Sequence, residues 1–371
     1  MTASVTTTIP GYSILIPQET EVGVSNYLES LRAGKTQVGA RLQKRLQGAD
    51  LQTMTPREFL GELLDTKKPQ IFAESAVAGD GSDWTLTELG LLGDISIAVP
   101  VTVFDDGKHS SPTPHPSPFA GTLVFTPGAL LRNGKGCTPA DEGEATGPDG
   151  KLSPEGYYNL YRRRLLPVFQ YVNHLAARPR SAFLTIPGLG CGQFAGRFSG
   201  KLGAQLQAVI ERFLTEQGAS FPNLKAVYFD PYSECENARS EIHGISFMVR
   251  PLTRGNSAKS QLCRPTAYAE AGDDFSDCAL FSIVAWDHVS WPGNDFYPGS
   301  RATDDGVKAA ATNSMFVLTG VEGTYDPACW KYQPPQPYRN WEDVVNKRGL
   351  RLWNPAAVWA LTMSHTPAGA T

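Results

Sequence analysis

The sequence predicts a three-layer α/β fold, in which a mixed, largely parallel sheet carries helices on both faces. Residues Leu280–Trp286 form an apolar run without charges or turn residues, as is typical of a strand buried on both faces of a sheet. Residues Ala182–Ile186 form a second such run, which leads through a glycine-rich loop into an amphipathic helical segment. This order of elements indicates an open sheet with ligand sites at the carboxyl ends of its strands.

The composition is that of a soluble globular protein. Of the 371 residues, 41% are hydrophobic and 19% are charged, which suits a sizeable core and excludes a disordered chain. The net charge of −4 gives no electrostatic reason to expect nucleic acid or an anionic membrane as a partner. No apolar run approaches the ~20 residues of a membrane helix, and the first residues lack the pattern of a signal peptide. We therefore expect a cytoplasmic or injected protein, and a monomer.

Three parts are predicted along the chain. Residues Glu21–Leu31 place apolar residues at three- and four-residue intervals, and Thr55 to Glu58 forms a capping box with proline at the first helical position. The last residues contain several tryptophans and prolines, which indicate one or two helices and then a frayed tail from Ser364. The predicted parts are a helical N-terminal extension (1–90), an α/β core (91–325) and a C-terminal extension packed on the core (326–371).

Within the core, β-branched and apolar runs predict strands, and Pro- or Gly-rich runs predict loops. Ser110–Pro118 is too rich in proline for a regular element, and Asn133–Gly150 is predicted to be a long surface loop. Ser153 is expected to cap a helix that Pro167 kinks or divides. Strands are predicted at residues 95–104, 121–127, 182–186, 224–229, 247–252, 280–286 and 315–318.

The glycine loop, Pro187–Gly200, has the sequence PGLGCGQFAGRFSG. Glycines at 188, 190, 192 and 196 expose backbone N–H groups, and a helix from Leu202 is predicted to follow directly, a geometry that binds phosphate oxygens. The alternative is a dinucleotide-binding oxidoreductase, because Gly190-x-Gly192-x-x-Ala195 matches a variant of that fingerprint. That fingerprint needs an acidic residue roughly 20 positions further on, whereas Asp230, at the next strand end, lies 35 positions beyond Ala195. A Walker A loop is excluded because no GKS or GKT follows.

The acidic segment, residues 287–305, begins where the strand Leu280–Trp286 ends. It contains Asp287, Asp295 and Asp305, with Asp304 beside the last, and Thr303 is expected to cap a helix. Each aspartate alone has an ordinary explanation as a cap, a turn former or a partner of the helix dipole. Together, at the end of a buried strand, they favour a site. Carboxylates are poor phosphate ligands, so we expect them to face sugar hydroxyls, an adenine amine or a cationic leaving group.

The six cysteines are scattered, with no CxxC pair and no histidine at metal-ligand spacing. We therefore expect reduced thiols and no metal site. Cys191 is the exception to consider, because it lies inside the glycine loop, but a cysteine nucleophile would need a histidine close in space.

Two stretches resemble those of a macrodomain, the fold that binds ADP-ribose. Thr185–Gly196 resembles the loop that holds the diphosphate and the distal ribose, and VAWDHVSWPGND…GSRATDDGVKAAA resembles the other loop, which leads through glycines into a helix. In most macrodomains the second loop comes first, so the order here looks circularly permuted. Over residues 95–325 the chain is most similar to the MavL-type macrodomain effectors, whose acidic residues match Asp287, Asp295 and Asp305 at spacings of 8 and 10.

This resemblance implies an ADP-ribosylhydrolase that acts on arginine side chains, with the arginine of ubiquitin as one candidate, and with ADP-ribose as ligand and product rather than cofactor. Asp295 and Asp305, with Asp287, would be catalytic, and no metal is implied. Asp287 replaces the usual macrodomain asparagine, which argues against release of ADP-ribose from aspartate or glutamate. The alternatives are a non-catalytic ADP-ribose reader and an ADP-ribosyl ester hydrolase. The implied ligand-binding residues are Gly188, Leu189, Gly190, Cys191, Gly192, Gln193, Phe194, Asp287, Gly299 and Ser300.

Overall fold

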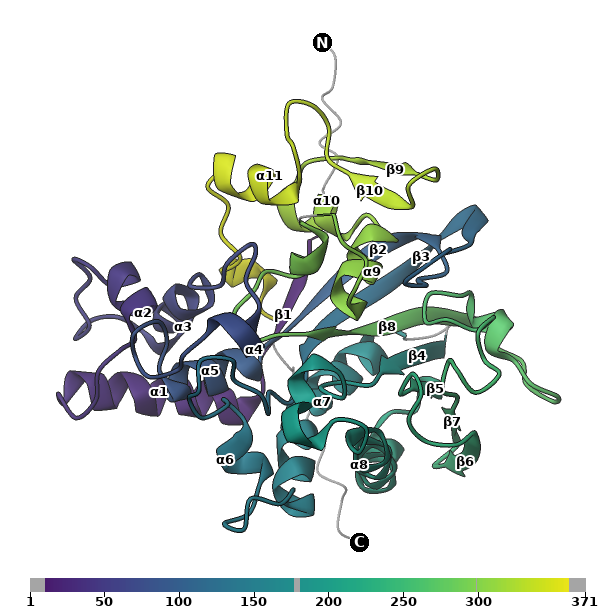
Figure 1. Cartoon of the computed structure of the whole chain (residues 1–371), viewed down its shortest axis with the longest axis horizontal. Coiled ribbons are helices and arrows are strands. Elements are labelled where there is room, and N and C mark those ends of the chain that lie inside the picture. Colours follow the sequence, from purple (N-terminus) through teal and green to yellow (C-terminus); the bar gives the residue numbers. More distant parts are fainter. Residues whose placement is uncertain (1–10, 177–180, 298, 360–371) are drawn as a thin grey trace, which may run out of the picture.

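The computed structural model describes residues 11–176, 181–297 and 299–359. Its centre is a mixed eight-stranded sheet with the order β1-β2-β3-β8-β4-β5-β7-β6 (Figure 1). The five strands from β3 to β7 in this order run parallel, and antiparallel strands complete both edges. This confirms the predicted α/β class. In sheet order the strands span Ser13–Leu15 (β1), Ser96–Asp105 (β2), Pro114–Pro127 (β3), Cys278–Trp286 (β8), Ser181–Pro187 (β4), Leu224–Asp230 (β5), Ile245–Val249 (β7) and Ala238–Ile242 (β6).

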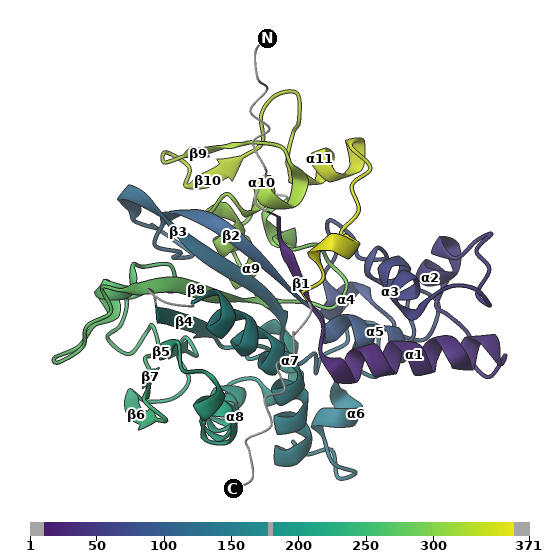
Figure 2. The same ribbon diagram turned by 180° about the vertical axis from the view of Figure 1, so that it is seen from behind.

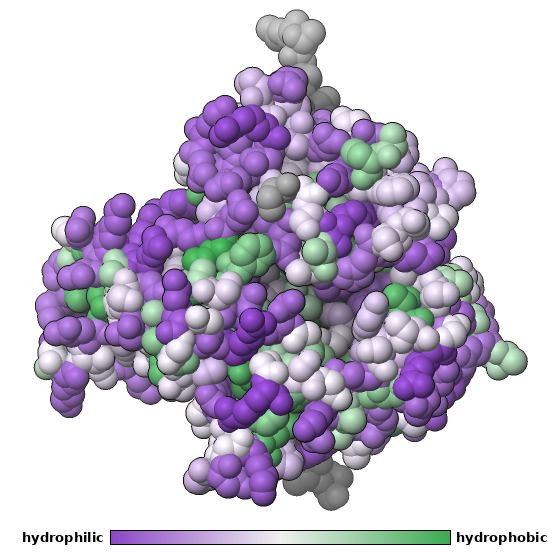
Figure 3. Space-filling view, viewed as in Figure 1, coloured by the Kyte–Doolittle hydropathy of each residue, from purple (hydrophilic) through white to green (hydrophobic). Residues whose placement is uncertain are grey.

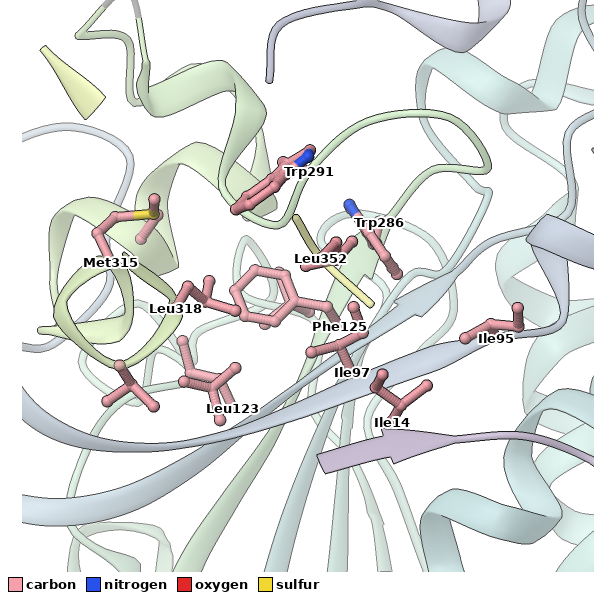
Figure 4. Packing of buried hydrophobic residues seen from close by; sticks show 14 of the residues in the cluster. Ile14, Ile95, Ile97, Leu123, Phe125, Trp286, Trp291, Met315, Leu318 and Leu352 are labelled. Carbon is pink, nitrogen blue, oxygen red and sulfur yellow. The ribbon is translucent and has the colours of Figure 1, made fainter. Parts of the chain in front are cut away.

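Two hydrophobic clusters lie on opposite faces of the sheet. Side chains of β8 alternate between them: Leu280, Val284 and Trp286 belong to the first cluster, and Phe281 and Ile283 to the second. The second cluster is covered by α7 (Pro154–Leu175) and α8 (Leu202–Gln217). The first is covered by α9 (Asp304–Ala310) and α10 (Ser314–Thr319), and it continues into the N-terminal helices, which lie to one side of the sheet in Figure 2. Figure 4 shows part of this cluster.

The N-terminal region is mainly helical, as predicted, but it also supplies β1, which the sequence analysis missed. β1 pairs antiparallel with β2 and so extends the sheet. Thr55 and Thr85 each form a capping box with the glutamate three residues later, which fixes the starts of two helices. The helices here are α1 (Gln18–Arg32), α2 (Ala40–Arg45), α3 (Pro56–Leu64), α4 (Ala73–Ala76) and α5 (Leu86–Gly93).

Two predicted loops contain regular structure. The Pro-rich segment was expected to be a loop, but β3 begins at Pro114. Proline has no backbone N–H to donate to a neighbouring strand. Because β8 pairs with β3 only from Gly121 onward, the prolines before Gly121 leave no hydrogen bond to β8 unmade. The Gly-rich segment 133–150 contains α6 (Glu142–Ala145) and the buried side chain of Asp141.

The predicted strand at Met315–Leu318 is wrong, because these residues lie in helix α10. A four-residue apolar run fits a buried helix as well as a strand, and Gly320, with φ of 68°, terminates the helix. Pro167 lies inside α7, which continues through it. The strand predicted at 247–252 is β7, shifted toward the N-terminus, and β6 was not predicted.

The C-terminal part forms a hairpin and one α-helix: β9 (Thr324–Asp326), β10 (Lys331–Gln333) and α11 (Trp341–Lys347). The tail predicted from Ser364 lies outside the described residues. The 3-10 helices are η1 (Gln193–Phe198), η2 (Gly218–Ser220), η3 (Pro265–Tyr268), η4 (Asn294–Phe296) and η5 (Pro355–Ala357).

Candidate functional site

A pocket of about 670 Å³ lies at the carboxyl ends of three neighbouring parallel strands. The last residues of β4, β5 and β8 (Pro187, Asp230 and Trp286) line it, as the rule for open α/β sheets predicts. Residues of the glycine loop and of the acidic segment both line it. Phe72, from the N-terminal region, contributes to the rim. The pocket therefore joins the two stretches that the sequence analysis singled out.

The glycine loop is held against the end of β3 by close backbone packing. Gly190 has φ of 70°, and a Cβ at this position would lie 2.8 Å from both the backbone nitrogen and the oxygen of Ala129. Glycine is therefore required here. The buried hydroxyl of Tyr161, on α7, donates to the carbonyl of Leu189 (2.6 Å) and accepts from the N–H of Ala129 (3.0 Å). Tyr161 thus ties the loop to the sheet.

Backbone amides of the loop are available to a ligand. The N–H groups of Gly190 and Gly192 donate to no acceptor among the described residues, and both glycines line the pocket. The helix predicted to follow the loop from Leu202 is confirmed as α8, and the loop itself contains the short helix η1. At the start of α8, the N–H of Gly203 donates to the carboxylate of Glu234 (2.7 Å). The anion donors that remain are therefore the loop amides rather than the α8 terminus.

Most of the predicted ligand-binding residues line the pocket, but three do not. Leu189 is fully buried in the second hydrophobic cluster, with its side chain away from the pocket. Gly299 and Ser300 lie in the acidic segment outside the pocket lining, and the hydroxyl of Ser300 accepts from the N–H of Ala302 (3.1 Å). The residues that do line it are Gly188, Gly190, Cys191, Gly192, Gln193, Phe194 and Asp287.

Asp287 lines the pocket while its carboxylate fixes a turn. One carboxylate oxygen accepts from the N–H groups of Val289 and Ser290, both at 2.7 Å, and the other accepts from the Ser290 hydroxyl at 2.5 Å. Its side chain is therefore held in one orientation by the loop that it begins. Asp287 can present a fixed negative charge to a ligand.

Asp295 and Asp305 are buried and incompletely hydrogen-bonded. Asp305 accepts from the N–H of Gly293 (2.7 Å), and Asp295 accepts from the hydroxyl of Thr303. The second oxygen of each carboxylate is buried without a partner in the described part of the chain. Burial raises the pKa of Asp305 well above its ordinary value, and the charge of Asp295 raises it further. Burial also raises the pKa of Asp295, against the effect of the Thr303 hydrogen bond. Such a pair can hold and transfer a proton.

A comparison with protein families gives a match to the macrodomain effector MavL family over residues 12–338. The chain belongs to the MavL macrodomain effector family. A comparison with curated proteins gives no match. The family implies an activity related to ADP-ribose, and macrodomains are often hydrolases. The mixed eight-stranded sheet is consistent with a macrodomain. The match begins before α1, so the MavL family includes the helical N-terminal region that the sequence resemblance left out.

Three further acidic residues of this MavL-family chain surround the site. Asp304 accepts from the N–H of Ala285 (2.8 Å) and pairs with the buried Lys308 (3.1 Å), which joins the start of α9 to β8. Asp230 lines the pocket, and burial raises its pKa. Burial also raises the pKa of Glu74, and the charges of Asp287 and Asp295 add to the effect. Glu74 was missed because nothing in the local sequence connects α4 with a loop more than 200 residues away.

The thiol of Cys191 lies at the pocket but is not activated. Only 8% of the residue is exposed, and burial raises its pKa well above the ordinary value. The sulfur contacts the carbonyl of Leu189 at 3.6 Å. A neutral, buried thiol is a poor nucleophile, so the MavL-family site offers carboxylates rather than a cysteine for chemistry.

Among the described residues, no group of three or more histidine, cysteine, aspartate or glutamate side chains could hold a metal ion. Within the same residues, the helices are too short or too polar to cross a bilayer. The face drawn in Figure 3 is mostly hydrophilic, with apolar residues in small separate patches.

Proposed function

We propose that this chain is an ADP-ribosylhydrolase that cleaves the N-glycosidic bond between ADP-ribose and an arginine side chain. Membership of the MavL family supports an ADP-ribose substrate. The observation that carries the reaction type is the pair Asp295 and Asp305, two buried carboxylates that each keep an unpaired oxygen beside a pocket facing the glycine loop. ADP-ribosylated ubiquitin is the candidate protein substrate that the family resemblance suggests.

The proposed ligand lies across the pocket. Its diphosphate accepts from the amides of Gly190 and Gly192, and its ribose or adenine donates to Asp287. The bond to be cleaved then lies toward Asp295 and Asp305 of the acidic segment. In this arrangement the two loops occur in the reverse of the usual macrodomain order, which we interpret as a circular permutation.

The chemistry requires proton transfer and charge stabilisation. Water attacks the anomeric carbon as the bond to the guanidinium nitrogen breaks, and the transition state carries positive charge on the sugar. One carboxylate takes a proton from the attacking water, and that proton ends on the departing nitrogen, so arginine leaves as a guanidinium ion. We assign these steps to Asp295 and Asp305, because two buried carboxylates with raised pKa values can accept and return a proton.

The test is mass spectrometry of an arginine-ADP-ribosylated protein after incubation with wild type, Asp295→Asn, Asp305→Asn and the exposed control Asp149→Asn. We expect removal of the modification by wild type and by the control only. An intact modification together with tight ADP-ribose binding would instead identify a reader. Release from glutamate-linked substrates alone would identify an ester hydrolase, release from serine-linked substrates alone would identify an O-glycoside hydrolase, and oxidation of NADH would identify an oxidoreductase.

A further inference from the structure

The N-terminal region holds the acidic segment through two consecutive lysines. Lys68 forms a parallel β-bridge with Ser290: its N–H donates to the carbonyl of Val289, and its carbonyl accepts from the N–H of Trp291, both at 2.7 Å. Four residues further on, Phe72 lines the pocket. The segment that follows α3 therefore lines the site. It is hydrogen-bonded to the acidic segment at residues 289–291, which lie between Asp287 and Asp295 in the chain.

Lys67 is a buried cation beside this bridge. Only 2% of it is exposed, and its ammonium group donates to the carbonyls of Asp287 (3.3 Å) and His288 (2.5 Å). The ammonium nitrogen lies 4.0 Å from the centre of the Trp286 ring, within the range of a cation–π contact. No carboxylate of the described residues lies within salt-bridge distance of it. Its partners are two successive carbonyls and one aromatic face, all belonging to the end of β8 and the turn that follows.

This arrangement orients the peptide groups of the turn. The carbonyl of His288 is directed at Lys67, so the N–H of Val289 in the same peptide group points to the opposite side, where it binds the Asp287 carboxylate. The carbonyl of Val289 is held in the same way by the N–H of Lys68, and the N–H of Ser290 also binds the Asp287 carboxylate. The positive charge and the carboxylate therefore hold the same turn from two sides. A buried ammonium group without an ion-pair partner is costly to a fold. Its position beneath a pocket-lining strand end is typical of a residue kept for a functional site.

We propose that Lys67 is a positioning residue: its ammonium group fixes the turn Asp287–Ser290 and thereby sets the acidic wall of the pocket. The catalytic step remains with the groups assigned above, so the expected effect on turnover rests on the proposed function. The expected effect on the mobility of the turn does not depend on the proposed function. A donor is required at this position, because an apolar side chain of similar length leaves two buried carbonyls without a hydrogen-bond partner.

The protonation of Lys67 gives an independent way to test this role. Burial lowers its pKa to about 7, against the charge of Asp287, while Arg164 on α7 lowers it further. Arg164 in turn binds Asp94 and Asp141, lies 3.4 Å from the ring of His288, and is close enough to Arg163 to be affected by its charge. If the charge holds the turn, the turn loosens as pH rises through this range. Arginine at position 67 stays charged, so it moves the change to higher pH.

The experiment compares Lys67→Met, Lys67→Arg and the control Lys68→Met, which keeps the backbone bridge. We expect hydrogen exchange of the peptide covering residues 287–295 to be at least tenfold faster in Lys67→Met than in wild type or the control. ADP-ribose affinity and kcat should each fall about tenfold in Lys67→Met. The protection factor of this peptide, which divides out the intrinsic base-catalysed exchange, should fall in wild type between pH 6 and 8, and Lys67→Arg should shift that fall to higher pH.

Equal exchange in wild type and in Lys67→Met would overturn the role of Lys67, and so would a pH dependence of the protection factor that Lys67→Arg leaves unchanged. If Lys67→Met does not fold, the pH dependence of exchange protection in wild type and in Lys67→Arg still tests the role of Lys67. A wild-type protein that leaves modified arginine intact would refute the proposed function, but it would leave the exchange measurements as a valid test of Lys67.

Discussion

Asp305 is buried at the start of α9, where burial raises its pKa and the charge of Asp295 raises it further, and each carboxylate keeps one buried oxygen without a donor from the described residues. The two residues lie ten positions apart, on η4 and on the start of α9. Their proximity stores unfavourable free energy in the folded protein, because two carboxylates in one buried place cannot both ionise freely. Such a cost is expected where a site needs a proton on one of two acids.

Asp305→Asn should remove activity and stabilise the fold. Because the folded-state pKa of Asp305 is raised, the unfolded chain ionises first as pH rises past about 4, and the carboxylate then lowers stability. The amide cannot ionise, so we expect a gain of about 1 kcal/mol in unfolding free energy at pH 7. The gain should disappear at low pH, where both forms are protonated. Hydrolysis should fall by roughly a hundredfold or more. Urea unfolding at pH 7 and pH 3 would check the stability, and a less stable variant at pH 7 would contradict this account.

Gly190 and Gly192 should separate folding from ligand binding. A Cβ at position 190 would lie 2.8 Å from the backbone of Ala129, at positive φ, so Gly190→Ala should cost about 2 kcal/mol of stability. A Cβ at position 192 meets nothing within 4 Å, so Gly192→Ala should change stability by no more than about 0.5 kcal/mol. Gly192→Ala should nevertheless weaken ADP-ribose binding, measured by calorimetry, because the added methyl group stands at a free amide. Unchanged affinity would place the phosphates elsewhere.

Arg164→Met should destabilise the protein strongly. The guanidinium is fully buried and binds Asp141 (2.7 Å) and Asp94 (3.2 Å), so its loss removes one ion pair from each of two buried carboxylates, at a cost of about 3–5 kcal/mol. Although burial alone raises the pKa of Asp141, Arg164 and His288 outweigh it and hold that pKa well below the usual range. This stabilisation is present above the unfolded-state pKa and is lost as pH falls through the folded-state pKa.

Denaturation at pH 7 and pH 3 would measure the destabilisation by Arg164→Met. The half-exposed ion pair of Arg162 and Glu19 provides a control for the loss of a surface charge. Arg162→Met should change the unfolding free energy by less than about 1 kcal/mol. The difference between wild type and Arg164→Met should shrink in acid. If the difference in unfolding free energy between wild type and Arg164→Met is the same at both pH values, the charge of Asp141 is not the source of the stabilisation.

Cys191→Ala should keep its activity. Burial raises the pKa of the thiol, so little thiolate exists at neutral pH and the sulfur has no part in the proposed chemistry. We expect kcat within about twofold of wild type, because truncating one buried side chain that takes no part in the chemistry costs stability rather than turnover. We also expect slow alkylation of Cys191 by iodoacetamide in the folded protein, measured by peptide mass spectrometry. Complete inactivation by alanine would indicate a covalent mechanism.

Several features of the fold could be predicted because their signals are local. The apolar run Leu280–Trp286 gave a central strand, and the cap at Thr303 gave the start of α9. The family resemblance was confirmed, and it extends further toward the N-terminus than the motifs indicated. By contrast, the apolar run at 315–318 is too short for its hydrophobic periodicity to distinguish a strand from a helix. Its helical conformation depends on packing within the first hydrophobic cluster.

The sequence by itself determined the chemical character of the two loops, because glycine content and aspartate spacing are properties of the chain alone. Only the tertiary structure decided that Leu189 turns away from the pocket, that Glu234 occupies the start of α8, and that Lys67 reaches the turn after β8. These relationships join residues far apart in the chain. They depend on how the strands are ordered in the sheet and on which side chains burial forces together, and no local pattern encodes either.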